Sequence, residues 1–91
     1  MISKQFTMGI DGLWSRPAEL LVRTAEKYAC KITVEHMDKC MDAKSMMGVF
    51  SLAVVAGDKV TISADGADEV EAMNDISALI EAGLVEGNKE K

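Results

Sequence analysis

The spacing of apolar residues alternates along the chain between a period of two, typical of a half-buried strand, and a period near 3.6, typical of a helix. Period-two segments occur around Phe6, Met8 and Ile10 and at residues 30–36, 40–42 and 60–64. Helical spacing occupies residues 15–29, 45–53 and 68–82. The predicted order of elements is therefore β-α-β-β-α-β-α.

This order limits the fold class. Strands that do not alternate one for one with helices favour an α+β domain, in which helices cover one face of a mainly antiparallel sheet. The other face of such a sheet meets water. A chain of 91 residues is short for more than one core. We expect a single domain over residues 1–85, followed by a polar tail at 86–91.

Two of the predicted helices begin with a serine. Ser15 precedes Arg16 and Pro17, which combines a hydroxyl able to accept a backbone N–H with a proline in the first turn. Ser45 directly precedes a short apolar segment with helical spacing, and we interpret it as a helix cap. The apolar positions of that segment are Met46, Met47, Phe50 and Ala53.

The last predicted helix has a different start signal. Asp68 is followed three residues later by Glu71, which resembles a capping box. One apolar stripe follows, and Gly83 ends the pattern. The stripe consists of Val70, Met73, Ile76, Leu79 and Ile80.

The charge balance restricts the partners. Fifteen acidic residues outnumber ten Lys and Arg, which gives a net charge of −5, and no basic run interrupts this balance. Nucleic acids and anionic membranes require a clustered positive field, so we expect neither as a partner. The chain has no apolar stretch near the ~20 residues of a membrane span and no pattern of a secretory leader. A cytoplasmic location is the expectation.

The cysteines and the histidine predict no metal site. Cys30, Cys40 and the single histidine, His36, cannot complete a four-ligand zinc site. Two cysteines are also too few for a disulfide scaffold, so we interpret them as reduced thiols that behave as small apolar residues. No cofactor is expected.

Two motifs resemble those of the HPr family, the small phosphocarrier proteins of the bacterial sugar phosphotransferase system. They are GLWSRPA at residues 12–18 and KSMMGVFSL at residues 44–52, and the segment ADGADE at 64–69 and the final helix extend the resemblance over nearly the whole chain. The resemblance implies an open-faced β-sandwich, with four antiparallel strands and three helices on one face.

The first motif departs from the family's pattern at one position. Trp14 occupies the place of the histidine that receives and passes on a phosphoryl group in the family. That chemistry needs an imidazole nitrogen with a free lone pair, whereas the indole N–H is a donor only. The resemblance therefore implies a chain without the carrier histidine, as in Crh-type members of the family, and Trp14 is either a loop aromatic or an exposed anchor for a partner.

Three other residues have two interpretations each. Arg16, beside the free N–H groups at a helix start, can hold a phosphate or carboxylate, or it is a solvated first-turn residue. For Ser15 we favour a role as helix cap over a role as phosphoryl acceptor, because a serine phosphate is a stable ester. His36 faces the same side of its strand as Ile32 and Val34, which favours packing over nucleophilic chemistry.

The second motif is intact, and the family assigns it a regulatory role. The resemblance implies that a dedicated ATP-dependent kinase, HPr kinase/phosphorylase, phosphorylates Ser45 and that the product binds a LacI-type regulator of catabolite genes. A phosphate adds about −1.5 to −2 charges. The apolar residues Met46, Met47 and Phe50 follow directly and can adapt to more than one partner. The alternative is that Ser45 is only a cap and these residues only core.

The leading hypothesis is thus a non-enzymatic, Crh-like regulator of carbon catabolite repression that is phosphorylated on Ser45 and lacks carrier activity. A second hypothesis is a phosphocarrier that uses Ser15 or His36 as the acceptor. A third is a scaffold without phosphorylation that binds a partner through Trp14 and the methionines. The resemblance also allows a homodimer formed by strand swapping.

Overall fold

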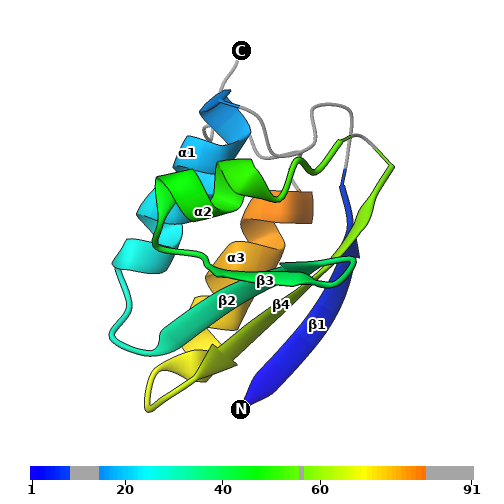
Figure 1. Cartoon of the computed structure of the whole chain (residues 1–91). Helices are drawn as coiled ribbons and strands as arrows, with labels where there is room; N and C mark the ends of the chain where they lie inside the picture. Colours follow the sequence, from blue (N-terminus) through cyan, green and yellow to red (C-terminus); the bar gives the residue numbers. More distant parts are fainter. Residues whose placement is uncertain (9–14, 56, 82–91) are drawn as a thin grey trace.

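The computed structural model describes residues 1–8, 15–55 and 57–81 (Figure 1). Their elements follow the predicted order β-α-β-β-α-β-α. The strands are β1 (Ile2–Thr7), β2 (Lys31–His36), β3 (Lys39–Asp42) and β4 (Lys59–Asp65). The helices are α1 (Ser15–Glu26), α2 (Met46–Ser51) and α3 (Glu69–Glu81).

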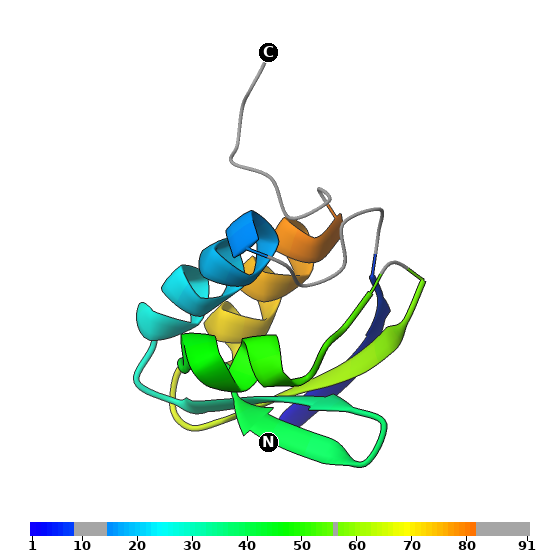
Figure 2. The same ribbon diagram turned by 45° about the horizontal axis from the view of Figure 1, so that its top comes forward.

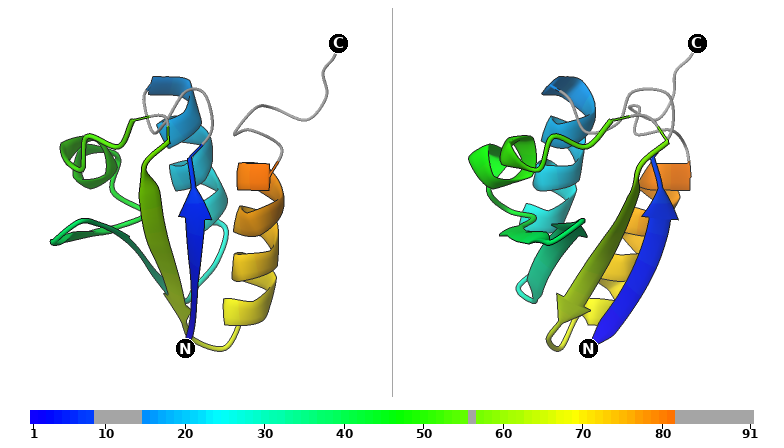
Figure 3. Two further views of the ribbon diagram at one scale, coloured as in Figure 1. Left: turned by 90° about the vertical axis from the view of Figure 1, so that its right-hand side faces the viewer. Right: turned by 45° about the vertical axis from the view of Figure 1, so that its right-hand side comes forward.

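The strands form one antiparallel sheet in the order β1-β4-β2-β3. All three helices lie over the same face of this sheet (Figure 2). The two longer helices, α1 and α3, pack side by side, whereas α2 packs against α1 and β3 (Figure 3). The predicted α+β class, with three helices on one face of a four-stranded antiparallel sheet, is confirmed.

The core fills the space between the sheet and the helices. β2 and β4 alternate between buried and more exposed positions, as their period-two spacing predicts. Their buried residues meet one stripe of α1 and one of α3. The largest fully buried side chains are Leu21, Ile32, Val34, Val49, Val54, Val60, Ile62 and Ile76. In β2 and β4 the opposite sheet face carries polar residues, among them Thr33, Glu35, Thr61 and Ser63.

The first strand begins and ends earlier than its apolar pattern predicts. β1 starts at Ile2 because it pairs with β4, whose Ala64 lies opposite Ile2. It ends at Thr7, although Met8 is buried and still donates to the Asp58 carbonyl at 2.8 Å. The predicted strand residue Ile10 lies outside the described residues. Cross-strand pairing, which hydropathy does not report, therefore sets the limits of this edge strand.

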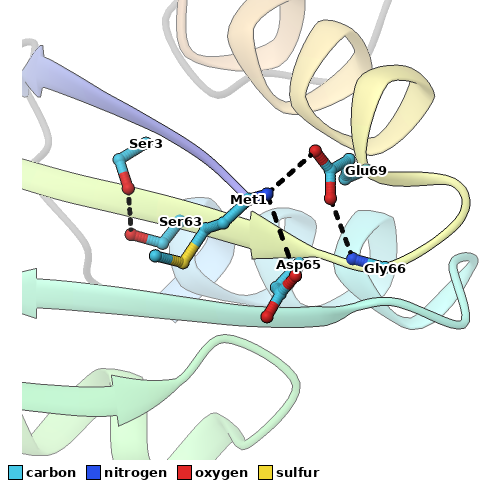
Figure 4. A network of polar contacts seen from close by, with 6 residues as sticks. All are labelled: Met1, Ser3, Ser63, Asp65, Gly66 and Glu69. Carbon is cyan, nitrogen blue, oxygen red and sulfur yellow. Dashed lines mark hydrogen bonds and ion pairs between the residues drawn. The ribbon is translucent and has the colours of Figure 1, made fainter.

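A polar network joins β1 to the turn that leads into α3 (Figure 4). The Ser3 and Ser63 hydroxyls lie 2.8 Å apart across β1 and β4. Glu69 accepts from the Gly66 N–H at 3.0 Å, and its other oxygen lies 3.2 Å from the Met1 amino group. The hydrogen bond from Gly66, followed by the Met1 amino group, holds the pKa of Glu69 below its usual range. Glu69 thus links the turn at Gly66 to the amino group of Met1, next to β1.

The capping box predicted for Asp68 and Glu71 is wrong. Both carboxylate oxygens of Asp68 accept hydrogen bonds from the chain before β2, from Ala29 N–H at 2.9 Å and Cys30 N–H at 3.0 Å. The residue that reaches back to an N–H three positions earlier is Glu69, which bonds Gly66. The Asp68 side chain, which the local pattern assigns to a helix cap, instead accepts hydrogen bonds from a segment that is distant in sequence.

The apolar faces of two helices also differ from prediction. α2 buries Val49, with Leu52 just beyond its end, and not Met47, Phe50 and Ala53. In α3, Met73, Ile76 and Ile80 are buried and Leu79 packs on the core as predicted, but Val70 is 55% exposed. A six-residue helix that is apolar on most sides gives no clear periodicity, so packing decides which side is buried.

Several sequence-based expectations concern termini and segments beyond this part of the chain. Gly83 and the tail at 86–91 lie outside the described residues.

No helix among the described residues is long and apolar enough to cross a membrane. Cys30 and Cys40 are free thiols; Cys30 is buried like a small apolar residue, whereas Cys40 is exposed, unlike the prediction for both.

Candidate functional site

Ser45 caps the N-terminus of α2, as its position before the apolar segment predicts. Its backbone is extended, with φ −108° and ψ 113°, and its carbonyl accepts the Val49 N–H at 3.0 Å. Its Oγ accepts the Gly48 N–H at 3.1 Å. The residue is half-buried. The hydroxyl therefore has a fixed position at the protein surface.

The segment before Ser45 is braced by its own polar groups. Asp42 accepts the Lys44 N–H on its carboxylate at 2.9 Å and the Ser45 N–H on its carbonyl at 3.0 Å. The Lys44 ammonium donates to the Tyr28 carbonyl at 2.6 Å, just beyond the end of α1. These bonds tie the start of α2 to the end of α1 and to β3.

Tyr28 is itself fixed to α3. Its hydroxyl donates to Asp75 at 2.7 Å. This hydrogen bond, then burial and the nearby negative charges, raise the pKa of Tyr28 to about 12. The Lys44 and Tyr28 contacts together connect α2, α1 and α3 near the Ser45 cap.

Gly48 provides the space in which the cap forms. A Cβ atom there would lie 3.3 Å from the Met41 Cβ and 3.3 Å from the Ser45 Oγ. A side chain at position 48 would crowd both the capping oxygen and the neighbouring strand β3. The absence of a side chain at Gly48 therefore leaves room for the Ser45 cap.

The three apolar residues predicted beside Ser45 lie in different environments. Met46 is half-buried and packs against the core. Met47 is 80% exposed and Phe50 is 41% exposed. Met47 and Phe50 form an exposed apolar pair on α2, one helical turn apart, in the same helix that Ser45 caps.

The first motif is described only in part. Trp14 lies outside the described residues. Ser15 and Arg16 form the beginning of α1, but their side chains also lie outside the described part, so the predicted cap and anion contact stay predictions. Pro17 is buried in the first turn.

Ser15 and the Ser45 cap lie toward different ends of α1. Ser15 begins this helix, whereas Lys44, next to Ser45, contacts the carbonyl of Tyr28 beyond its last turn. The first and last of the twelve residues of α1 are eleven steps of 1.5 Å apart, roughly 16 Å along the axis. The backbone at the start of α1 is therefore distant from the Lys44–Tyr28 contact beside Ser45.

His36 is a packed residue at the end of β2, as its alternation predicts. It is 7% exposed, and both ring nitrogens contact acceptors, the Leu52 carbonyl at 2.9 Å and Asp58 at 3.0 Å. Its partners follow it by 16 and 22 residues, and no local pattern in the sequence indicates them.

No group of three or more His, Cys, Asp and Glu side chains within residues 1–8, 15–55 and 57–81 is arranged to hold a metal ion. Among these residues, the candidate site is the Ser45 hydroxyl with the hydrogen-bonded residues Asp42, Lys44 and Gly48 around it. The chemistry available at Ser45 is that of an alcohol, which accepts a group on oxygen.

The family follows from comparison with known proteins. The family model described as "PTS HPr component phosphorylation site" matches residues 3–82. The chain belongs to the HPr family. HPr-family membership agrees with the architecture and with the two sequence motifs.

Individual HPr-family relatives cover nearly the whole chain. The HPr-like protein Crh of Halalkalibacterium halodurans is 40% identical over 82 residues, which are 89% of this chain and 98% of that protein. The crystal structure of HPr-C-His from Thermoanaerobacter tengcongensis has 40% identity and a TM-score of 0.90, covering 99% of this chain and all of that one.

A third relative is Crh of Bacillus subtilis, a catabolite repression protein whose crystal structure is a domain-swapped, intertwined dimer. It shares 34% identity at a TM-score of 0.72 and covers 94% of this chain and 95% of its own. The chain is thus similar to both HPr and Crh proteins, which connects it with the phosphotransferase system and with catabolite repression.

Proposed function

We propose that this HPr-family chain is a Crh-like regulatory protein of carbon catabolite repression, phosphorylated on Ser45 and without phosphocarrier activity. The observation that supports it best is the Ser45 cap, because a half-buried hydroxyl in a fixed position stands in an intact second motif. The 40% identity to a Crh protein supports the same assignment.

The surroundings of Ser45 suit a signal that acts at the surface. Its Oγ is held by a backbone N–H, so a phosphate on this oxygen adds about −1.5 to −2 charges at a defined place. The adjacent Lys44 ammonium already binds the Tyr28 carbonyl. Met47 and Phe50 are exposed on the same helix. A partner can therefore contact new charge and apolar side chains together.

The absence of carrier activity is argued from Trp14 and His36. Trp14 stands at the position of the family's phosphorylated histidine, and an indole cannot take that role. His36 is buried with both ring nitrogens in contact with acceptors, which leaves no accessible lone pair for phosphoryl transfer. Both features favour a protein that is phosphorylated but does not pass the phosphoryl group on.

The proposal includes the partners that the family implies. They are HPr kinase/phosphorylase, which would act on Ser45, and a LacI-type regulator, which would bind the phosphorylated form in the cytoplasm. A homodimer formed by strand swapping is the proposed oligomer, supported by the domain-swapped dimer of Crh from Bacillus subtilis. Trp14, Ser15 and Arg16 would form a separate partner contact at the start of α1.

The test offers the chain two phosphoryl donors in separate incubations and measures intact mass. With ATP and an HPr kinase, the wild type should gain one phosphate. With phosphoenolpyruvate and the general phosphotransferase enzyme, it should gain none. Ser45→Ala should gain none from either donor. Ser45→Asp keeps a side-chain oxygen for the helix cap but has no hydroxyl, so it should also gain none, which separates loss of the acceptor from loss of the cap.

The matched control is Ser51→Ala. Ser51 lies in the same helix, is exposed and donates to the Gly48 carbonyl at 2.7 Å. This variant should be phosphorylated like the wild type. Kinase labelling retained in Ser45→Ala would refute the site, and an acid-labile phosphate obtained from phosphoenolpyruvate would restore the phosphocarrier hypothesis.

A further inference from the structure

Lys44 makes the one long-range hydrogen bond of the segment that carries Ser45. Within the described part of the chain, the other hydrogen bonds of residues 44–51 join positions at most four apart. The Lys44 ammonium instead donates to the carbonyl of Tyr28, 16 residues away, at 2.6 Å. This contact is partly buried. It ties the residue before Ser45 to the end of α1.

Tyr28 is a fixed point for this bond. Its amide N–H donates to the Ala25 carbonyl at 3.2 Å, which continues the end of α1. Its hydroxyl donates to Asp75 of α3 at 2.7 Å, and the half-buried ring packs against the core. The Tyr28 carbonyl is therefore held by contacts with two helices, and Lys44 is fastened to it.

α2 depends on such a contact at its N-terminal end. A helix of six residues is far below the ~12–15 that are marginal in isolation, so tertiary contacts fix its place. Its fully buried residue, Val49, lies in its second half. The last residue bonded to the sheet is Ala43, whose N–H donates to Ile32 at 2.9 Å. Ser45 lies between these two anchors, where the Lys44 ammonium makes the hydrogen bond to another element.

We infer that Lys44 is a positioning residue for the phosphorylation of Ser45: its ammonium fixes the acceptor hydroxyl relative to the body of the domain and does not act by contact with the kinase. This role rests on the proposed function, because it requires that a kinase acts on Ser45. The ammonium acts through the backbone. Lys44 and Ser45 are adjacent, and the N–H groups of both donate to Asp42.

The transfer requires an oxygen in a defined place with a free lone pair. The Ser45 Oγ forms a bond to the γ-phosphorus of ATP, the bond from that phosphorus to the bridging oxygen of ADP breaks, and the hydroxyl proton passes to a base of the kinase. A hydroxyl oxygen has two lone pairs. One accepts the Gly48 N–H, so the other is available for the attack. Phosphoryl transfer depends mainly on positioning and electrostatics, so a displaced hydroxyl slows the reaction.

Steady-state kinetics of Lys44→Met with ATP and an HPr kinase test this role. The variant removes the donor but keeps an unbranched side chain. Its kcat should fall about tenfold or more, since a misplacement of about 1 Å can cost ~100-fold. The KM for the protein substrate should change by less than about twofold, because the ammonium is bound internally. A raised KM at constant kcat would mean that the kinase contacts Lys44, and would overturn the inference.

Two further variants separate the hydrogen bond from the charge. Lys27→Met is the matched control, because Lys27 lies next to Tyr28 but its side chain is 65% exposed and its ammonium is 4.0 Å from Asp75. Its kcat and KM should equal those of the wild type. Lys44→Arg keeps a donor for the Tyr28 carbonyl and should recover most of the kcat. An arginine variant as slow as Lys44→Met would contradict the role of the hydrogen bond.

Nuclear magnetic resonance of the unmodified wild type tests the bond without any variant. The Lys44 ammonium should exchange its protons with water more slowly than the exposed Lys27 ammonium. A scalar coupling between Lys44 Nζ and the Tyr28 carbonyl carbon should also be detected. Equally fast exchange of the two ammonium groups would overturn the inference, even if Lys44→Met does not fold.

Intact mass separates the failure of this role from the failure of the proposed function. If the wild type gains no phosphate from the kinase, or if Ser45→Ala still gains one, the proposed function fails and the role of Lys44 fails with it. If the wild type is phosphorylated on Ser45 and Lys44→Met reacts with the same kcat, only the role of Lys44 fails.

Discussion

A Cβ atom on Gly66 would lie 2.6 Å from the Cβ of Cys30 and 2.8 Å from its Cα. The turn between β4 and α3 thus passes directly against the chain that enters β2. Gly66 also has a φ of 154°, a region open almost only to glycine. Because the opposing atoms are backbone and Cβ, no side-chain rotation relieves the overlap.

Gly66→Ala should therefore destabilise the domain strongly. We expect the free energy of unfolding to fall by at least about 2 kcal/mol, from overlap and backbone strain together. Gly57→Ala is the control, since Gly57 has a φ of 89° but no atom within 4 Å of an added Cβ. It should lose only about 1 kcal/mol. Urea denaturation measures both, and equal losses would contradict the packing argument.

Tyr28 should make the domain sensitive to alkali. Its pKa is raised to about 12 by the hydrogen bond to Asp75, whereas an unfolded tyrosine ionises near ~10. The contribution of the Tyr28–Asp75 hydrogen bond to stability is complete below pH ~10. It falls as pH rises toward the pKa of Tyr28 in the folded chain, because tyrosine in the unfolded chain ionises first. Tyrosinate absorbance measures this directly, since Tyr28 is the only tyrosine.

Asp75→Asn tests the cause of this shift. It keeps an acceptor oxygen for the Tyr28 hydroxyl but removes the negative charge. The absorbance titration should move back toward ~10. A titration curve that stays at the wild-type position would show that Asp75 is not responsible.

Asp68 should contribute to stability at neutral pH and lose that contribution in acid. The N–H of Ala29, followed by contacts from Cys30, lowers the pKa of Asp68. A lowered folded pKa means that the stabilisation is complete above the unfolded value of ~3.9 and disappears as pH falls below it. Thermal melting of wild type and Asp68→Asn between about pH 5 and pH 2 checks this, because the variant should lose less stability over that range. An identical acid-induced decrease in both would contradict it.

The two sides of α2 should respond differently to truncation. Val49 is fully buried, so Val49→Ala should cost about 2 kcal/mol of unfolding free energy. Met47 is 80% exposed, and Met47→Ala should change stability by no more than about 0.5 kcal/mol. Chemical denaturation ranks the two variants, and the reverse order would mean that α2 packs on its other side.

The elements that sequence reasoning predicted well are those whose burial follows the local period. β2 and β4 alternate along their length because one face lies on the core. The Ser45 cap was also predictable, since a cap depends on residues three positions apart.

The remaining features depend on contacts between distant parts of the chain. The limits of β1 follow from pairing with β4, and Asp68 was assigned to a cap because its partners lie 38 and 39 residues away. The contacts of His36 with Leu52 and Asp58 are of the same kind. Periodicity reports only whether a residue is buried, and not which atoms it meets.

The order of strands in the sheet affects how the domain is made. β4 lies between β1 and β2, and its pairs with β1 run from Thr7 with Lys59 to Ile2 with Ala64. A growing chain therefore holds its first strand unpaired until residues 59–65 have left the ribosome. At ~5–20 residues per second this wait lasts roughly 3 to 12 seconds. Until then β1 and β2 both lack the strand that lies between them, and their uncovered apolar sides expose the nascent chain to aggregation.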